Sequence, residues 1–216
     1  MWDKVRRLRK RPGLALALAL LGCLALGALG ADWIAPHPPD RQQLERRLEG
    51  PSLEFPLGTD LYGRCVLSRV IHGIRPSLGL AVLVVATVAG IGVLIGIPAA
   101  YYQTLDAVLM RVTDCIFAFP HLVVALVVLS ILPPGAFSLC VALVLPGWPK
   151  YARIARAAAL AVRQEDYVEA AVALGACDAR LLARTILPNS LNPVLSVATI
   201  DIGHKIEVIA ALGFLG

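Results

Sequence analysis

The sequence is poor in charged and aromatic residues. Of its 216 residues, 16% are charged and 6% are aromatic, whereas 58% are apolar and the mean hydropathy is +0.74. Soluble globular proteins have about 45–50% apolar and about 25% charged residues, so this composition nearly excludes that class. Intrinsic disorder is excluded as well, because it requires high polarity and high net charge.

The sequence also lacks the motifs of soluble enzymes and metal centres. Its five cysteines include no CxxC pair and its four histidines lie far apart, which suggests neither a zinc site nor a disulfide framework. No lysine is followed by serine or threonine, as a phosphate-binding loop requires, and no HExxH or GxSxG segment occurs. We therefore expect no catalytic residue, metal site or cofactor, so any energy source must be a partner or an ion gradient.

Positive charge is concentrated at the N-terminus. The net charge is +5, and the basic cluster Lys4–Arg11 directly precedes an uncharged run from Gly13 to Ala31. Because about 20 apolar residues span a bilayer as a helix, we expect a cytoplasmic N-terminus over residues 1–12 and a first transmembrane span over residues 13–34. This pattern favours a membrane anchor over nucleic-acid binding. A cleavable signal peptide is the alternative, because Ala28-Leu29-Gly30 resembles a cleavage site.

Four more apolar segments follow a polar external loop that we predict over residues 35–76. The predicted spans cover Ser77–Ala100, Cys115–Leu132, Ala136–Val162 and Asn192–Gly216, and a short polar turn at Tyr101–Asp114 separates the first two of these. We therefore predict an all-α, polytopic transmembrane helix bundle of about five spans, with residues 77–216 as its core. Basic residues favour the cytoplasm, which places residues 164–188 inside, although the arginines of the 35–76 loop disagree with an external position.

The predicted cytoplasmic loop has the pattern of two short helices joined near Gly175. Small side chains at Ala170 and Ala171 permit close helix contact, and Gly175 permits a sharp reversal. Pro188 fixes the start of the next span. These features are typical of a docking helix. The alternative is an ordinary amphipathic loop helix, because alanine is the best helix former.

This loop reads EAAVALGACDARLLARTILP and resembles the EAA–x3–G loop of the membrane-spanning permease subunits of bacterial ATP-driven importers that use a separate solute-binding protein. Three further segments resemble the dipeptide, oligopeptide and nickel branch of that family: PLGTDLYGRCVLSRVIHGIRPSLG at Pro56–Gly79, LDAVLMRVTD at Leu105–Asp114 and YARIARAAALAVRQEDYVEAA at Tyr151–Ala171. The resemblance implies that the helix around Asp166–Gly175 is a coupling helix that sits in a groove of an ATPase, with Glu169 and Gly175 at matching positions.

The resemblance also implies the location and the partners. It implies a six-span protein in the bacterial plasma (inner) membrane, with ATP-binding subunits at the cytoplasmic face, a second permease subunit and an extracytoplasmic solute-binding protein. Three positions depart from the branch: Cys65 replaces Asp, Gln103-Thr104 replaces Gly-Gly, and ALGFLG ends at Gly216 before the family's last external loop and sixth span. We therefore expect a truncated family member.

Ionisable residues in the predicted fifth span mark a candidate translocation pathway. Asp201, His204 and Glu207 lie where a charged side chain costs about 2.5 kcal/mol or more and normally faces a cavity. Asp201 and Lys205 are four residues apart and can pair on one helix face, which is the alternative to substrate contact. The run ATIDIGH at Ala198–His204 resembles nickel-type members, and histidine is the commonest metal ligand.

Together these features predict a permease subunit that is not an enzyme. It would couple the motion of ATPase subunits to the import of dipeptides, oligopeptides, nickel or metal chelates. An ion-coupled secondary transporter is the alternative, and it would show inverted repeats with broken helices at matching places. The sequence contains no such repeat.

Overall fold

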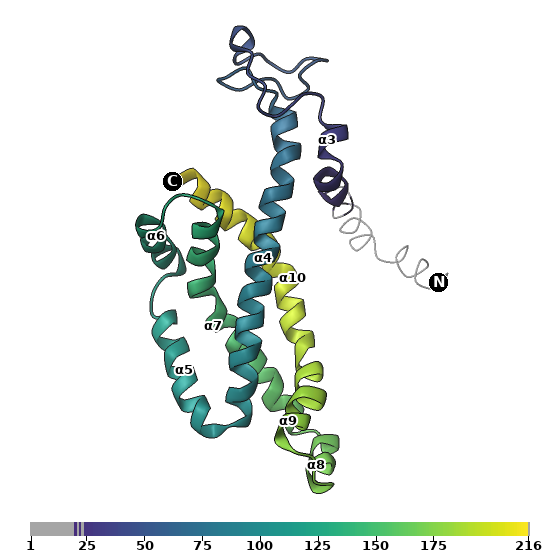
Figure 1. Ribbon diagram of the computed structural model, residues 1–216, viewed down its shortest axis with the longest axis vertical. Helices are drawn as coiled ribbons and strands as arrows, with labels where there is room; N and C mark the ends of the chain where they lie inside the picture. Colours follow the sequence, from purple (N-terminus) through teal and green to yellow (C-terminus); the bar gives the residue numbers. More distant parts are fainter. Residues whose placement is uncertain (1–19, 21, 23, 216) are drawn as a thin grey trace, which may run out of the picture. The chain divides into compact units, whose positions relative to one another are not determined.

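The structure, a computed structural model, describes residues 20, 22 and 24–215, and this part of the chain is mostly helical (Figure 1). Its elements are α3 (Ala31–Ile34), η1 (Leu44–Arg46), α4 (Val66–Tyr101), α5 (Gln103–Phe117), α6 (His121–Ile131), α7 (Ala136–Arg163), α8 (Asp166–Ala173), α9 (Asp178–Leu181), the π-helix η2 (Leu182–Ile186) and α10 (Leu187–Leu215). Within the described residues, β pairing is limited to one isolated bridge between Thr59 and Cys65. The predicted all-α class is confirmed.

Parts of three predicted segments fall on undescribed positions. The cytoplasmic N-terminus predicted over residues 1–12 lies outside the described residues, as do residues 13–19, 21 and 23 of the first span predicted over residues 13–34 and Gly216 at the end of the predicted fifth span. The chain divides into two compact units after Gly79.

Helix α4 begins within the segment that was predicted to be loop. It starts at Val66, whereas the sequence placed the start of this span at Ser77. The arginines before Ser77 suggested a loop, but Val66, Val70 and Ile74 recur at the four-residue spacing of one helix face. Among the described residues, α4 is the one unbroken helix that is long and apolar enough to cross a membrane.

The prediction for residues 101–132 was wrong in two respects. The polar turn predicted at Tyr101–Asp114 is mostly helix α5, and the span predicted at Cys115–Leu132 is divided between α5 and α6, which meet at 81°. Pro120 explains the break, because it lacks an N–H group and disfavours helical geometry at Phe119. If this bent pair counts as one crossing, the described residues hold two candidate spans, so the count of five remains a prediction.

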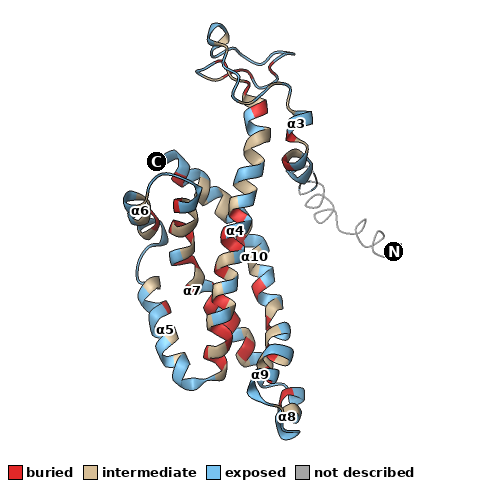
Figure 2. Ribbon diagram, in the orientation of Figure 1, coloured by how far each residue is buried: buried red, intermediate tan, exposed pale blue. Residues whose placement is uncertain are grey.

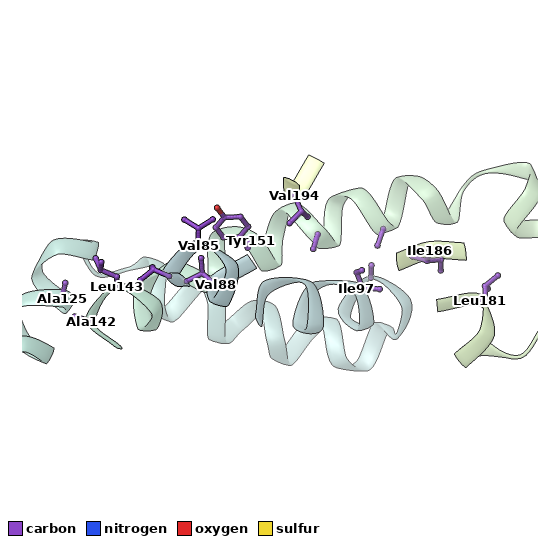
Figure 3. Packing of buried hydrophobic residues seen from close by; sticks show 14 of the residues in the cluster. Val85, Val88, Ile97, Ala125, Ala142, Leu143, Tyr151, Leu181, Ile186 and Val194 are labelled. Carbon is purple, nitrogen blue, oxygen red and sulfur yellow. The ribbon is translucent and has the colours of Figure 1, made fainter. Parts of the chain in front are cut away.

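Helix α7 is the centre of the second unit. It contacts α5, α6 and α10, and its internal prolines Pro146 and Pro149 are buried (Figure 1). Pro193 lies inside α10. Helices in membranes tolerate such prolines because neighbouring groups satisfy the freed backbone. The core joins Val85 and Val88 of α4, Tyr151 of α7 and Val194 of α10 in one buried cluster (Figures 2 and 3).

Two glycines let α4 and α7 approach closely. A Cβ atom at Gly92 would overlap Tyr151, and a Cβ atom at Gly96 would overlap the carbonyl oxygen of Ala152 and the backbone nitrogen of Arg156. Such small-residue contacts are how membrane helices pack, since lipid removes the hydrophobic drive between them. The sequence pattern indicated only that these glycines are tolerated in a span.

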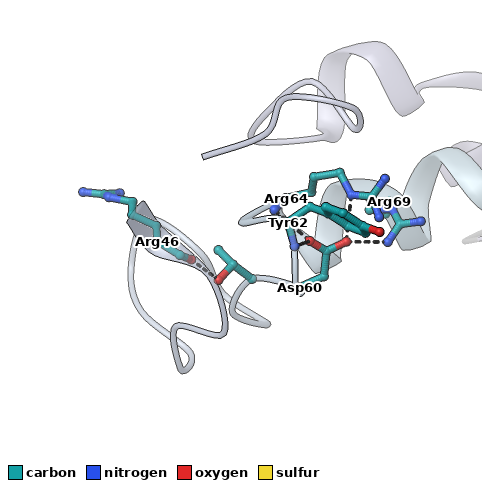
Figure 4. Close-up of polar contacts among 6 residues, drawn as sticks. Arg46, Asp60, Tyr62, Arg64 and Arg69 are labelled. Atoms are coloured by element: carbon teal, nitrogen blue, oxygen red, sulfur yellow. Dashed lines mark hydrogen bonds and ion pairs between the residues drawn. The ribbon is translucent and has the colours of Figure 1, made fainter. Parts of the chain in front are cut away.

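The first unit contains a folded loop organised around Asp60 (Figure 4). Oδ1 of Asp60 accepts hydrogen bonds from the backbone N–H groups of Tyr62 (2.8 Å) and Arg64 (3.0 Å), and Oδ2 accepts them from Arg64 Nε (2.8 Å) and Arg69 Nη1 (2.6 Å). Gly63 has φ of 69°, and a Cβ atom there would overlap the carbonyl of Gln43. This geometry explains the spacing of the TD–GR–SR segment in physical terms.

These hydrogen bonds set the ionisation of Asp60. Burial opposes the charged carboxylate, but the hydrogen bonds from Arg64 and Tyr62 outweigh it and lower the pKa of Asp60 to about 2. Because the ordinary pKa of an aspartate is about 3.9, the stabilisation by ionised Asp60 is complete above that pH and is lost as the pH falls towards 2.

Asp60→Asn is expected to loosen this loop by about 2 kcal/mol, because it removes the charge from several hydrogen bonds. Pepsin should cleave residues 42–64 of the wild type slowly at pH 4 and rapidly at pH 2, whereas the variant should be cleaved rapidly at both. Asp40→Asn, at an exposed acid, is the control and should behave as wild type. Equal cleavage of the wild type at both pH values would contradict the assignment.

Candidate functional site

Helix α8 carries the predicted docking residues and is held in the structure by one buried side chain. Val168 is buried in the core, whereas Glu169 and Ala170 are exposed and Ala171 is half-buried. Glu169 lies in the first turn of α8, where the helix dipole favours a negative charge. The helix therefore contacts α7 on one face and leaves another face open.

Helix α8 ends in a left-handed turn at Gly175. This residue has φ of 80°, its N–H group donates to the carbonyl of Val172 (2.9 Å), and the N–H of Ala176 donates to the carbonyl of Ala171 (3.1 Å). Glycine adopts this conformation without the steric cost that a Cβ atom brings. The reversal expected from the sequence thus lies at Gly175.

The chain returns to the bundle through α9 and the π-helix η2. Leu181 at the end of α9 and Ile186 at the end of η2 are buried in the core (Figure 3). Helix α10 begins at Leu187, before the start predicted at Asn192, and continues directly from η2, so that Pro188 lies next to the π-helix. π-Helices are rare and occur frequently at functional sites.

Hydrogen bonds tie this loop to the end of α4. The hydroxyl of Tyr101 donates to Oδ1 of Asp178 (2.7 Å), at the start of α9. Nη1 of Arg163, at the end of α7, donates to the carbonyls of Ala100 and Tyr101 (3.2 Å each). The sequence analysis missed these contacts, because it treated Tyr101 as part of a turn and Arg163 only as a topology signal.

A second cluster of polar residues lies between α7 and α10. Asp201 is 6% exposed and accepts hydrogen bonds from Nζ of Lys150 (2.9 Å) and from the hydroxyl of Tyr151 (3.0 Å). The expected pairing of Asp201 with Lys205 is therefore wrong. Packing of α10 against α7 brings the partners from another helix, which spacing along one helix does not reveal.

A cavity of about 350 Å³ adjoins this cluster. Its lining includes five ionisable side chains, two of which were predicted as pathway residues, namely Asp201 and His204; the others are His121, Lys150 and Lys205. Glu207 does not line the cavity and lies 3.6 Å from His204 in an exposed pair. Among the described residues, no group of three His, Cys, Asp or Glu side chains could hold a metal ion.

Ion pairs also join α5 to α7. The guanidinium of Arg156 forms two hydrogen bonds with the carboxylate of Asp106, and Arg153 pairs with Asp114 while lying 4.4 Å from the ring centre of Phe117. A further hollow of about 570 Å³ opens beside these pairs. The signal was present in the sequence as opposite charges in the segments Leu105–Asp114 and Tyr151–Ala171, but their pairing requires α5 to be a helix.

Comparisons with known proteins agree on one family. Residues 92–216 match the model for "binding-protein-dependent transport system inner membrane component", and residues 1–51 match the model for the "N-terminal TM domain of oligopeptide transport permease C". The chain is 40% identical to a putative peptide transport system permease protein of Brucella suis, and the match covers 98% of this chain and 71% of the relative.

Two more relatives have similar coverage. A di/tripeptide transport system permease protein of Pseudomonas aeruginosa is 37% identical over 94% of this chain and 68% of its own length. A glutathione transport system permease protein of Escherichia coli is 34% identical over 100% of this chain and 72% of its own length. The similarity therefore includes both units of the chain.

Proposed function

The chain belongs to the family of binding-protein-dependent transport system inner membrane components, and on that premise we propose that it is the permease subunit of an ATP-driven importer of peptides. The observation that carries the proposal is the loop of α8 and α9, which is anchored by buried residues and exposes Glu169 and Ala170 of the EAA segment. ATP hydrolysis would belong to separate subunits, so the chain itself is not an enzyme. A solute-binding protein and a second permease subunit would complete the transporter.

The tip of the loop has the composition of a docking surface. Leu174 is 89% exposed and Val172 is 55% exposed, next to the small and acidic side chains of Ala170 and Glu169. Exposed apolar side chains that lie together often mark a protein–protein contact. We propose that an ATP-binding subunit covers this surface in the cytoplasm.

The contacts behind the docking surface supply a route for motion. A shift of α8 and α9 would pull on Tyr101 of α4 through Asp178, and on the bundle core through Leu181 and Ile186. Closure of the ATPase subunits would thereby favour one of two arrangements of the bundle, in which α7 and α10 open or close the pathway. Asp201 and His204 would line that pathway.

Peptides are the substrate class that the relatives support. The relatives described above are named for peptides or glutathione. The cavity also carries charges of both signs, at Lys150, Lys205 and Asp201, which suits a zwitterionic peptide. Nickel, which the ATIDIGH run suggested, remains the alternative that an uptake experiment excludes or supports.

Removal of this chain from its native transporter is expected to abolish uptake of radiolabelled dipeptides and tripeptides, and its return should restore uptake. Nickel uptake, measured in the same cells with ⁶³Ni²⁺, should not change. If removal of the chain leaves dipeptide uptake intact but abolishes nickel uptake, the proposed substrate class is contradicted.

A further inference from the structure

The cavity between α6, α7 and α10 contains a lysine that its neighbours do not neutralise. Lys205 contributes to the lining, yet it forms no ion pair with any carboxylate of the described residues. Both oxygens of Asp201, which lies one helical turn away, already accept hydrogen bonds, from Lys150 and from Tyr151. Asp201 carries one negative charge against the two positive charges of Lys150 and Lys205, so one positive charge remains in this cluster.

The other ionisable groups leave this charge in place. Glu207 is exposed, pairs with His204 and lies outside the cavity lining. A histidine side chain is either neutral or positively charged, so His121 and His204 add no negative charge. A cation held against apolar walls is unfavourable unless an anion reaches it. The cavity thus has a net positive charge near Lys205.

The ammonium group of Lys205 lies beside α7 at Gly147. A Cβ atom at Gly147 would lie 3.8 Å from Nζ of Lys205 and 3.0 Å from a methyl carbon of Val88. The distance of 3.8 Å is ordinary van der Waals contact, so the lysine lies against α7 at this position. The apolar wall beside it comes from side chains that include Leu122, Leu143 and Val208.

We propose that the ammonium group of Lys205 binds the C-terminal carboxylate of the transported peptide while the apolar wall receives its last side chain. This inference rests on the proposed function, because it specifies which part of the peptide the permease recognises. A volume of about 350 Å³ lies within the range of about 300–1,000 Å³ that is usual for small-molecule sites, and it accommodates one end of a peptide. A charge-assisted hydrogen bond gives the site its selectivity.

The test compares a peptide that has a free carboxylate with the same peptide as its C-terminal amide. Initial rates of uptake of trialanine and trialanine amide are measured in cells with the native transporter, and their ratio is taken for each variant. The solute-binding protein is the same in all cells, so its own preference cancels when the ratios are compared. Rates are divided by the amount of permease in the membrane.

Lys205→Met should lower the ratio of acid to amide uptake roughly tenfold, because a hydrogen bond to a charged group is lost. Lys205→Arg should keep the wild-type ratio. Ser196→Ala, at an exposed position of α10, is the control and should also keep it. An unchanged ratio in Lys205→Met would overturn the inference, whereas absence of peptide uptake in the wild type would contradict the proposed function itself.

A second measurement uses the wild-type protein and therefore does not depend on the folding of a variant. A water-soluble carbodiimide is added to the purified transporter with trialanine, and the peptide adducts on its lysines are mapped by mass spectrometry. The inference predicts an amide bond between the carboxylate of trialanine and Nζ of Lys205. An excess of a competing dipeptide should suppress formation of this adduct, whereas the C-terminal amide of that dipeptide should not. Adducts that avoid Lys205 would overturn it.

Discussion

Gly96→Leu is expected to prevent stable accumulation of the protein. A side chain at this position would meet the backbone of α7 at Ala152 and Arg156, and backbone atoms cannot move aside as a flexible side chain can. The two helices would have to separate, which would expose the buried alanines of α7 at Ala152, Ala155 and Ala159. We expect a loss of about 3 kcal/mol or more.

Gly90 provides a matched control on the same helix. A Cβ atom at Gly90 has nothing within 4 Å, so Gly90→Leu should accumulate nearly as the wild type does. The measurement is the amount of each variant in the membrane, together with its thermal unfolding in detergent. Equal amounts of Gly96→Leu and Gly90→Leu would show that α4 and α7 do not depend on this contact.

Glu169→Lys and Gly175→Leu are expected to reduce peptide uptake at least tenfold while the protein still reaches the membrane. Gly175 has φ of 80°, so a leucine there would distort the end of α8, although open space surrounds it. Glu169→Lys would reverse an exposed charge on the proposed docking surface. An exposed charge change alters stability by about 0.5 kcal/mol, so the membrane abundance of Glu169→Lys should stay within about a factor of two. The strain in Gly175→Leu costs about 1–2 kcal/mol, so its abundance should fall no more than several-fold.

The readout is co-purification of the ATP-binding subunit and peptide-dependent ATP hydrolysis. Both should fall in the two variants. Glu45→Lys, which reverses the charge of an exposed acid in the first unit, should leave both unchanged. Normal co-purification in Glu169→Lys and Gly175→Leu would remove the coupling role from α8.

Local features of the sequence predicted the helical class and the reversal between α8 and α9. Glycine is the residue that best tolerates φ of 80°, so the reversal at Gly175 could be placed from the sequence alone. The acidic residues Asp166 and Glu169 likewise lie in the first turn of α8, where the helix dipole favours them. Such signals depend only on residues that are close together in the sequence, so they can be predicted from the sequence alone.

Contacts between helices could not be predicted in the same way. The partners of Asp201 lie about fifty residues earlier in the chain, at Lys150 and Tyr151, so spacing along α10 favoured Lys205 instead. Helix α5 was read as a turn because its polar residues face α7, where Asp106 and Asp114 find arginines. A charge that is neutralised by another helix gives the same local pattern as a charge in a loop.

The position of Cys177 in the assembled transporter tests the coupling role most directly. Cys177 is exposed at the start of α9, and Cys115 is exposed on α5. Variants that keep only one of these cysteines and retain transport are labelled with benzophenone maleimide and irradiated. We predict that Cys177 links to an ATP-binding subunit and that Cys115 does not. A link from Cys177 to the solute-binding protein, or none to the ATP-binding subunit, would contradict the proposed coupling.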